Sequence, residues 1–458
     1  MTTHASTLPK SEEENLDIIP RKYSFSFTAA LGGQNIIFGI QLSFLMFAFT
    51  DILGLLPAAV GTLLLVARVW DGFNDPLMGI LADRTNTRWG KFRPWLLFVP
   101  VPLAIVTTLC FYNPGFSYTG TLIYAYVIYI AWGMLYTLTD IPIWSLSTVM
   151  TRNSSARTKM VSVARSFSTM GILVPTILIP VLAEKFSPED PSQGYFYSVA
   201  IFAVLSVPLI TMAFFGVKER LVVDRPKFKL SDTYHVFKSN KPLQITFLTM
   251  LCSALTAAPV SAVIYFAMYN LGDAKQMGII SLISMIGMII GMAFTPYMIK
   301  RIEKKGVIIF TSIMRVALLG LYFYLGYDNL MIVYVMTFVL ATMNSPFLVL
   351  QPLMVGDSVD YAEWKTGIRS EGTAFSCMTF ANKIITAIGA FAVGMLLAAT
   401  NYVAGTSQSQ ETMDGIFLAM TLLPAISCLL MLIPIRFYNL NEATLATISK
   451  ELETKNAK

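Results

Sequence analysis

Charged residues, histidines and paired cysteines are all scarce in this sequence. Only 13% of its 458 residues are charged, whereas a soluble domain usually carries about 25%. The two histidines, His4 and His235, lie outside the apolar segments, which excludes a histidine-based metal site or catalytic triad inside a membrane. The four cysteines stand far apart without a CxxC motif, so we expect them to pack as small hydrophobic side chains. We therefore expect no enzyme and no cofactor.

Two further features are missing. The polar, acidic stretch 1–20 has no short apolar core followed by a small-residue cleavage site, so we expect no signal peptide. The net charge of +6 is spread over short loops instead of being concentrated on a soluble domain. In such loops basic residues set membrane topology, so we expect no nucleic acid partner.

Long apolar runs dominate the chain, which is 55% hydrophobic with a mean hydropathy of +0.63. A bilayer-spanning helix needs about 20 mostly apolar residues. Twelve segments approach or exceed this length: 25–50, 57–83, 94–113, 120–150, 159–183, 194–216, 243–270, 276–299, 307–326, 329–356, 372–400 and 412–436. The sequence therefore predicts an all-α membrane protein with twelve transmembrane helices, and the lipid bilayer as a partner.

Lysine and arginine alternate between the predicted loops, and this alternation gives the orientation. They gather in every second loop, as in 84–93, 152–159 and 300–305, and are nearly absent from the others. The basic side is cytoplasmic, and an even number of helices then places both termini in the cytoplasm. We expect a cytoplasmic tail, a six-helix bundle, a central cytoplasmic loop, a second six-helix bundle and a second tail: 1–24, 25–217, 218–242, 243–437 and 438–458. Two such halves are typical of a secondary transporter, with its substrate site near the bilayer midplane.

Ionisable residues inside the second apolar segment are the strongest functional signal. Arg68, Asp71 and Asp75 are three and four residues apart, so they share one helical face, and Asn74 lies beside them. A charge at the centre of a transmembrane helix costs roughly 2.5–3.5 kcal/mol on insertion scales, and such residues normally line an ion or substrate pathway. Two neighbouring carboxylates would suit an alkali cation or a proton. The alternative is a structural ion pair between Arg68 and Asp71.

The fourth apolar segment carries a second polar face, made of Thr137, Asp140 and Trp144. A carboxylate accepts hydroxyl groups, and an indole ring offers a flat apolar surface for the other face of a sugar. This combination predicts a sugar site. The alternative is that Trp144 lies at the membrane interface and Asp140 pairs with a buried base.

Two further positions are candidates for substrate binding. Lys383 lies too deep in the eleventh segment for easy snorkelling, so we expect it to meet a carboxylate from the other half, in a site or in a structural salt bridge. The first segment contains the polar pair Gln34-Asn35, whose amides could bind a polar ligand or an adjacent helix.

Charged residues at the cytoplasmic ends of the helices are candidates for a gate. Asp83 ends the second segment and Arg84 and Arg88 follow it, and these charges could latch one conformation and release it in another. An ordinary positively charged loop is the alternative. The acids within 357–363 are expected to pair with the basic loops.

Taken together, the sequence segments that contain these residues resemble the glycoside–pentoside–hexuronide:cation symporters, the melibiose-permease type within the major facilitator superfamily. The resemblance runs from about Tyr23 to Tyr438 and is most evident in ARVWDGFNDPLMGILADRTNTRWGKFRPW (67–95), YTLTDIPIWSL (136–146) and DSVDYAEWKTGIR (357–369), with Lys383 at the expected place afterwards. It implies a major facilitator fold and alternating access between two states.

The resemblance also implies roles for individual residues. Four positions match the family's cation site, with Na⁺ or H⁺ as the coupling ion: Asp71, Asn74, Asp75 and Thr137. Four match its sugar site: Asp140, Trp144, Arg165 and Lys383. The melibiose type has a Lys-Asp pair where this chain has Gln34-Asn35, so a sugar-binding carboxylate is missing here. That departure argues against α-galactosides and leaves pentosides, other glycosides and hexuronides open, while Asn74 and Thr137 favour sodium over protons.

We therefore predict a monomeric, multi-pass symporter of the bacterial cytoplasmic membrane that imports a sugar with Na⁺ or H⁺. Asp71 and Asp75 would hold the cation, and Asn35 would join the other sugar-site residues. One alternative is a cation-coupled carrier of amphipathic lipids on the same fold. Another is a sugar sensor that binds without transporting, although such a sensor would usually carry a sizeable soluble output domain.

Overall fold

The computed structural model describes residues 18–85, 87–151, 154–220, 237–238, 240–367 and 371–456. In this part of the chain every element beyond the isolated Thr87–Gly90 bridge is a helix. The chain divides into two compact units, the first made of Met1–Leu55 and Val69–Arg225 and the second of Leu56–Arg68 and Pro226–Lys458. The predicted all-helical architecture is confirmed.

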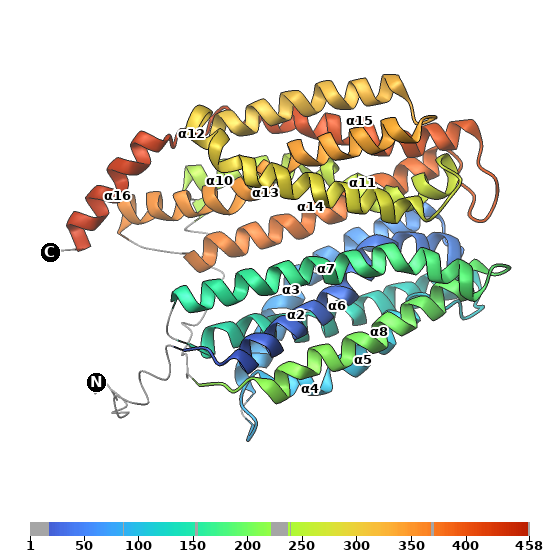
Figure 1. Cartoon of the computed structure of the whole chain (residues 1–458), viewed down its shortest axis with the longest axis horizontal. Coiled ribbons are helices and arrows are strands. Elements are labelled where there is room, and N and C mark those ends of the chain that lie inside the picture. The colour runs from blue at the N-terminus through green and yellow to red at the C-terminus, as the bar shows by residue number, and fades with distance from the viewer. Residues whose placement is uncertain are drawn as a thin grey trace. The chain divides into compact units, whose positions relative to one another are not determined.

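Helices of the first unit follow the first six apolar segments (Figure 1). They are α2 (Arg21–Phe47), η1 (Ala48–Ile52), α3 (Pro57–Arg84), α4 (Arg93–Phe98), α5 (Pro100–Leu109), α6 (Tyr118–Val149), α7 (Ser154–Phe186) and α8 (Pro191–Gly216). The opening residues of α3, up to Arg68, belong to the second unit. The predicted single segment 94–113 is divided between α4 and α5 at Val99, where Pro100 removes a backbone donor.

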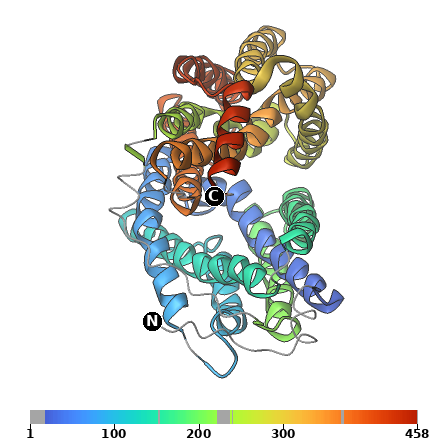
Figure 2. The ribbon, with the colours of Figure 1, turned by 90° about the vertical axis from the view of Figure 1, so that its left-hand side faces the viewer.

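The second unit contains the remaining helices, which Figure 2 shows nearly end-on. They are α10 (Lys241–Cys252), η2 (Ala254–Ala257), α11 (Ala258–Tyr265), η3 (Phe266–Asn270), α12 (Gln276–Leu325), α13 (Leu330–Thr366), α14 (Glu371–Ala399), α15 (Gln410–Ile435) and α16 (Glu442–Asn456). Within α12, Glu303 has φ +57° and ψ 168°, a non-helical conformation that separates the two predicted segments 276–299 and 307–326. These two segments are therefore successive helices joined by a kink.

Eight of the described helices are long and apolar enough to cross a membrane, or nine if α10 to η3, which bends by 46°, forms one span. Large apolar side chains remain exposed on these helices, among them Val204, Phe215 and Tyr324 at 65%, 68% and 85%. Exposed apolar surface of this extent is a liability in water, but it suits a lipid environment. The prediction of a multi-pass membrane protein therefore agrees with the helix lengths and surfaces.

Short polar side chains mark where several helices begin. Each accepts a hydrogen bond from a backbone N–H of the first turn, which would otherwise have no partner. The residues that do so are Ser117 before α6, Asp190 before α8, Asn240 before α10, Asn329 before α13 and Ser409 before α15.

Glycines allow α2 to pack closely against α7 and α8 in the first unit (Figure 1). A Cβ on Gly33 would lie 2.6 Å from Cβ of Leu209 on α8, and a Cβ on Gly39 would lie 2.7 Å from Cα of Ile172 on α7. From the other side, a Cβ on Gly171 would lie 2.5 Å from a carbonyl oxygen of α2. These contacts fix the rotation of α2 and hence the direction in which its polar residues point.

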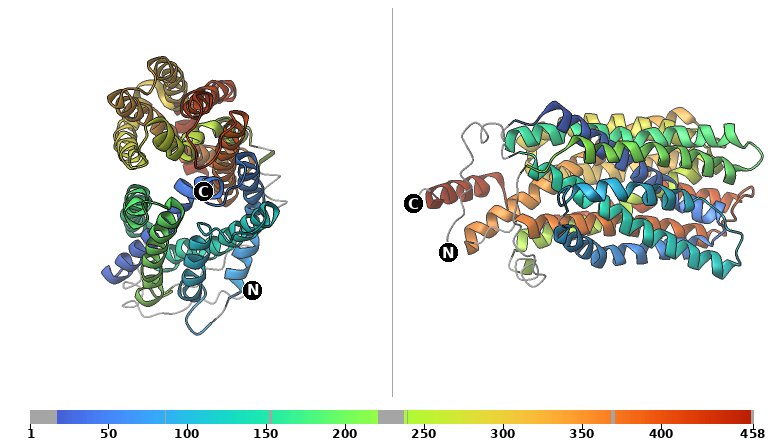
Figure 3. Two further views of the ribbon diagram at one scale, coloured as in Figure 1. Left: turned by 90° about the vertical axis from the view of Figure 1, so that its right-hand side faces the viewer. Right: turned by 90° about the horizontal axis from the view of Figure 1, so that it is seen from below.

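In the second unit a buried apolar cluster joins α10, α12, α13, α14 and α15 with the C-terminal helix α16. Ile448 of α16 is only 3% exposed and belongs to this cluster, while Leu445 and Leu452 pack against it. Figure 3 shows α16 at the end of the second unit's bundle. The sequence prediction of a tail over 438–458 missed this helix.

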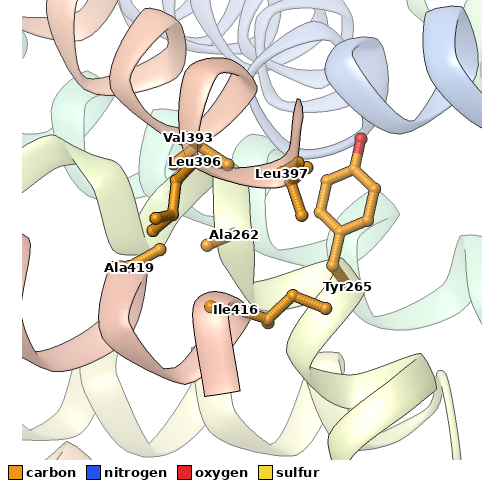
Figure 4. A pocket seen from close by; sticks show the side chains of 8 residues that line it. Ala262, Tyr265, Val393, Leu396, Leu397, Ile416 and Ala419 are labelled. Atoms are coloured by element: carbon orange, nitrogen blue, oxygen red, sulfur yellow. The ribbon is translucent and has the colours of Figure 1, made fainter. Parts of the chain in front are cut away.

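A small apolar gap lies inside the second unit between α11, α14 and α15 (Figure 4). Tyr265 and Leu397 are among its lining residues, and the gap has no room for a water-sized molecule. It is a packing defect and is unsuited to a sugar.

Candidate functional site

The two aspartates of α3 face α6 in register. Thr137 Oγ1 donates a hydrogen bond to Asp75 Oδ1 at 2.9 Å, and a Cβ on Gly133 would lie 3.0 Å from Asp71 Oδ1. Asp71 and Asp75 are four residues apart, as are Gly133 and Thr137, and the contacts join them in the same order. The two helices therefore run parallel here, and the glycine leaves space for a carboxylate.

Asn74 lies between the two carboxylates in the sequence and is almost completely buried, with 1% of its surface exposed. Neither its Nδ2 nor its Oδ1 has a hydrogen-bond partner within the described part of the chain. A buried polar group without a partner costs roughly 1–3 kcal/mol, so most such groups in proteins are satisfied. The side chains of Asp71, Asn74, Asp75 and Thr137 all carry oxygen atoms, which are the type of ligand that an alkali cation prefers. We refer to these four residues as the oxygen cluster.

A second polar group surrounds Asp140, one turn further along α6. Asp140 Oδ1 accepts hydrogen bonds from Gln34 Nε2 at 2.9 Å and from Trp144 Nε1 at 3.1 Å. The guanidinium carbon of the exposed Arg165 lies 5.0 Å from the centre of the Trp144 ring. These four residues, called the Asp140 cluster below, offer a carboxylate, a guanidinium and an indole, which is chemistry suited to a polyhydroxyl ligand.

The amide that reaches this cluster is Gln34 and not the predicted Asn35. Asn35 Nδ2 donates to the carbonyl of Leu31 in its own helix at 2.8 Å. Gln34 is completely buried, and its Oε1 has no hydrogen-bond partner among the described residues. One signal could have favoured Gln34: Gln41 lies seven residues further along, on the same helical face, and is also buried.

One face of α6 connects the two clusters. Gly133, Thr137, Asp140 and Trp144 follow one another at intervals of four, three and four residues, so they form a continuous stripe along the helix. We call this the α6 stripe. Its first two members contact the aspartates of α3, and its last two belong to the Asp140 cluster.

The remaining basic candidates, Arg68 and Lys383, belong to the second unit and are half-buried. Lys383 lies on α14, and the nearby Thr379 and Thr386 both donate to carbonyls of their own helix.

Two of the three gate candidates have described side chains. Arg84 and Arg88 are exposed, and the guanidinium of Arg88 lies 4.7 Å from the centre of the Trp89 ring. The side chain of Asp83 lies outside the described part of the structure. In the second unit Lys304 Nζ approaches Asp357 Oδ2 at 2.7 Å, which confirms for Asp357 the predicted pairing of these acids with a basic loop.

The apolar spans, together with the buried or half-buried carboxylates of α3 and α6, define a multi-pass membrane transporter. The chain belongs to the family described as MFS/sugar transport protein, whose profile matches residues 28–442. It is thus a sugar transporter of the glycoside–pentoside–hexuronide symporter group, and not an enzyme. Its relatives include an inner membrane symporter of Escherichia coli, and the chain is a multi-pass protein of the bacterial inner membrane.

Individual relatives share nearly the whole length. The chain is 30% identical to the isoprimeverose transporter of Lactiplantibacillus pentosus, with 96% of this chain and 93% of the relative covered. It is 29% identical to the glucuronide carrier protein homolog of Escherichia coli, with 92% and 93% covered. Among solved structures, the nucleoside transporter NupG matches with a TM-score of 0.66 at 15% identity, covering 89% of this chain and 98% of that one. This likeness confirms the major facilitator fold.

Proposed function

We propose that the chain imports a sugar by symport with Na⁺ or H⁺ through alternating access. The observation that supports this best is the α6 stripe, because a single helix face contributes to both the oxygen cluster and the Asp140 cluster. A ligand in one cluster could then influence the other through a shift or rotation of one helix. Coupled transport requires this kind of connection between two binding sites.

The oxygen cluster is our proposed cation site, with Asp71 and Asp75 supplying the negative charge. Thr137 and Asn74 would add neutral oxygen ligands, and the unpartnered Oδ1 of buried Asn74 supports such a role. Neutral oxygens are needed to replace the hydration shell of a metal ion, whereas a proton needs only one basic group. The set therefore favours Na⁺ over H⁺, and the transported Na⁺ is a substrate of the cycle.

The Asp140 cluster is our proposed sugar site. Asp140 would accept hydroxyl groups, Arg165 would donate to ligand oxygens, and the Trp144 ring would cover an apolar sugar face. The family resemblance adds Lys383 as a further candidate, and the polar Gln34-Asn35 pair of the first segment adds Asn35. The named substrates of the two relatives, isoprimeverose and glucuronides, support a glycoside, pentoside or hexuronide as the substrate class.

The proposed cycle follows from linkage between the sites. Cation binding between α3 and α6 would favour the state that binds sugar at Asp140, and sugar must then raise cation affinity by the same factor. The loaded carrier would alternate between states open to either side, with Asp83, Arg84 and Arg88 as gate residues at the cytoplasmic ends.

We further propose twelve spans, with both termini cytoplasmic and bundles over 25–217 and 243–437. The nine apolar spans become ten if α12 is divided at Glu303, eleven with α3, and twelve with α4 and α5 counted together. The charged residues within α3 lower its hydropathy below that of a typical apolar span. The break at Pro100 leaves α4 and α5 each too short to cross a membrane alone. We expect the transporter to act as a monomer.

Uptake into proteoliposomes tests the proposal. A panel of labelled pentosides, glycosides and hexuronides is offered under an imposed inward Na⁺ gradient, an inward H⁺ gradient or neither, with lysolipids as competitors. Accumulation of a sugar under one of the two gradients is expected. Uptake that ignores both gradients would remove the symport mechanism, binding without uptake would favour a sensor, and competition by lysolipids alone would favour the lipid carrier.

A further inference from the structure

The four residues that follow α8 form an unusual junction in the first unit. The carboxylate of Glu219 accepts three consecutive backbone N–H groups: those of Lys91 at 2.9 Å, Phe92 at 2.8 Å and Arg93 at 3.1 Å. These groups open the short helix α4, where backbone donors lack helical partners. A carboxylate is a strong acceptor for such donors. Glu219 therefore fastens the loop between α3 and α4 to the end of α8.

Gly90 is the residue that permits this close approach. Its φ is +108°, a left-handed conformation that other residues rarely adopt, and a Cβ there would lie only 2.6 Å from Glu219 Oε1. The Arg93 side chain adds a second connection, because its Nε and Nη2 both donate to the Phe214 carbonyl at the end of α8, at 3.0 and 2.6 Å. The Trp89 ring packs edge-on against the Phe214 ring with 5.8 Å between centroids.

Arg220 extends the junction to two further helices. Its backbone N–H donates to the Val149 carbonyl at the end of α6 at 3.0 Å, and its Nη1 donates to the Ile18 carbonyl just before α2 at 3.0 Å. We call Glu219 and Arg220 the clasp. The clasp thus connects the ends of α2, α6 and α8 with the loop that leaves α3.

Two of the helices at this junction carry the proposed site: α6, which the clasp contacts at Val149, and α3, which it reaches through the loop that follows. Asp75 lies nine residues before Arg84 at the end of α3, and Asp140 lies nine residues before Val149 at the end of α6. At 1.5 Å per residue, both distances are roughly 13 Å. The Thr137–Asp75 hydrogen bond requires α3 and α6 to keep a parallel register, and a connection at their common end would preserve it.

We propose that the clasp is a positioning element that makes α3 and α6 move together during transport and thereby sets the turnover rate without contacting sugar or cation. This inference rests on transport, which family membership establishes, and needs neither the identity of the sugar nor that of the coupling ion. If Glu219 had only a local role, replacing it would loosen the backbone of residues 90–93 alone. If it positions α3 and α6, replacing it also loosens the ends of these two helices.

Hydrogen–deuterium exchange of the full-length protein in nanodiscs tests this directly without any substrate. E219Q replaces one acceptor oxygen with an NH₂ group that faces backbone donors, whereas K218Q changes the exposed neighbouring residue and is the matched control. In E219Q we expect exchange to rise at least about fivefold in peptides covering 75–85 and 143–149 as well as 90–93, given the strength of hydrogen bonds to charged groups. Unchanged exchange in 75–85 and 143–149 would overturn the proposal.

Transport kinetics supply a second readout, with ¹⁴C-labelled isoprimeverose and a labelled methyl glucuronide as probes. We expect E219Q to lower Vmax at least about fivefold while KM stays within twofold, E219D to recover part of the rate, and K218Q to match the wild type. An unchanged Vmax in E219Q, or a rise in KM as large as the loss of Vmax, would contradict a positioning role. If E219Q fails to accumulate in the membrane, E219D carries both measurements: a smaller change in the same direction is expected, and wild-type exchange and Vmax in E219D would overturn the proposal. The rates are measured as counterflow, the exchange of labelled for unlabelled probe across the membrane, which needs no ion gradient. A defect in cation coupling would then leave the comparison of E219Q with the wild type intact, so the two failures can be told apart.

Discussion

Replacing Asp75 with asparagine should remove most of the cation affinity while leaving the local structure intact. The asparagine side chain has nearly the same shape, and its Oδ1 can still accept the Thr137 hydrogen bond now made at 2.9 Å. What disappears is a full negative charge at the cation site. Two unit charges 4 Å apart interact by about 4 kcal/mol at an effective dielectric constant of ~20. Because each 1.4 kcal/mol is a factor of ten, we expect the cation Kd to rise roughly 10³-fold.

The assay is calorimetric titration of Na⁺ into the purified protein, together with sodium-stimulated sugar accumulation in proteoliposomes. Asp51 in η1 offers a matched control in the same unit, since its Oδ2 also accepts a threonine hydrogen bond, from Thr50 at 2.6 Å. D51N should keep the wild-type cation Kd within about twofold. Wild-type sodium affinity and accumulation in D75N would refute the assignment of the oxygen cluster.

Three further substitutions test other parts of the account. G133A places a Cβ 3.0 Å from Asp71 Oδ1, so we expect cation affinity to fall about tenfold while sugar binding at saturating cation is unchanged. Both are measured by titration. A cation affinity of G133A equal to that of the wild type would show that the space beside Asp71 is not needed for cation binding. Q34L removes the Gln34 hydrogen bond to Asp140 Oδ1 and should raise the sugar KM about tenfold with little effect on cation Kd, whereas an unchanged KM would exclude this role. Arg315, in α12, is 7% exposed, and its Nε has no partner among the described residues. R315M should therefore raise the melting temperature and increase the free energy of unfolding by about 1–4 kcal/mol. A lower melting temperature would show that the charge is compensated.

Helices of this protein could be predicted well from sequence because the bilayer requires long apolar segments, and such segments are easily recognised. Breaks within them were harder to predict. Pro100 divides α4 from α5, and proline is a known signal, but the left-handed residue at the kink in α12 is Glu303, which has no such signature. The helix α16 was missed because its apolar residues form a narrow stripe in a polar sequence, and its burial depends on packing against α13 and the apolar cluster of the second unit.

Candidate site residues on one helix could be grouped by spacing alone, as the α6 stripe illustrates. Choosing between adjacent residues required knowledge of how the helix is rotated. Gln34 and Asn35 differ by about 100° around α2, and the glycine contacts with α7 and α8 decide which of them reaches Asp140. The clasp was also inaccessible to sequence reasoning, because Glu219 meets amides 126–128 residues away along the chain.

The most direct test of the whole account is the movement of the ion itself. Proteoliposomes without any ionic gradient are given an inward sugar gradient, and Na⁺ entry and internal pH are recorded together. The account predicts that sugar drives Na⁺ or H⁺ inward in the wild type and that D75N abolishes this flux. Sugar entering the vesicles with no accompanying movement of either ion would contradict it.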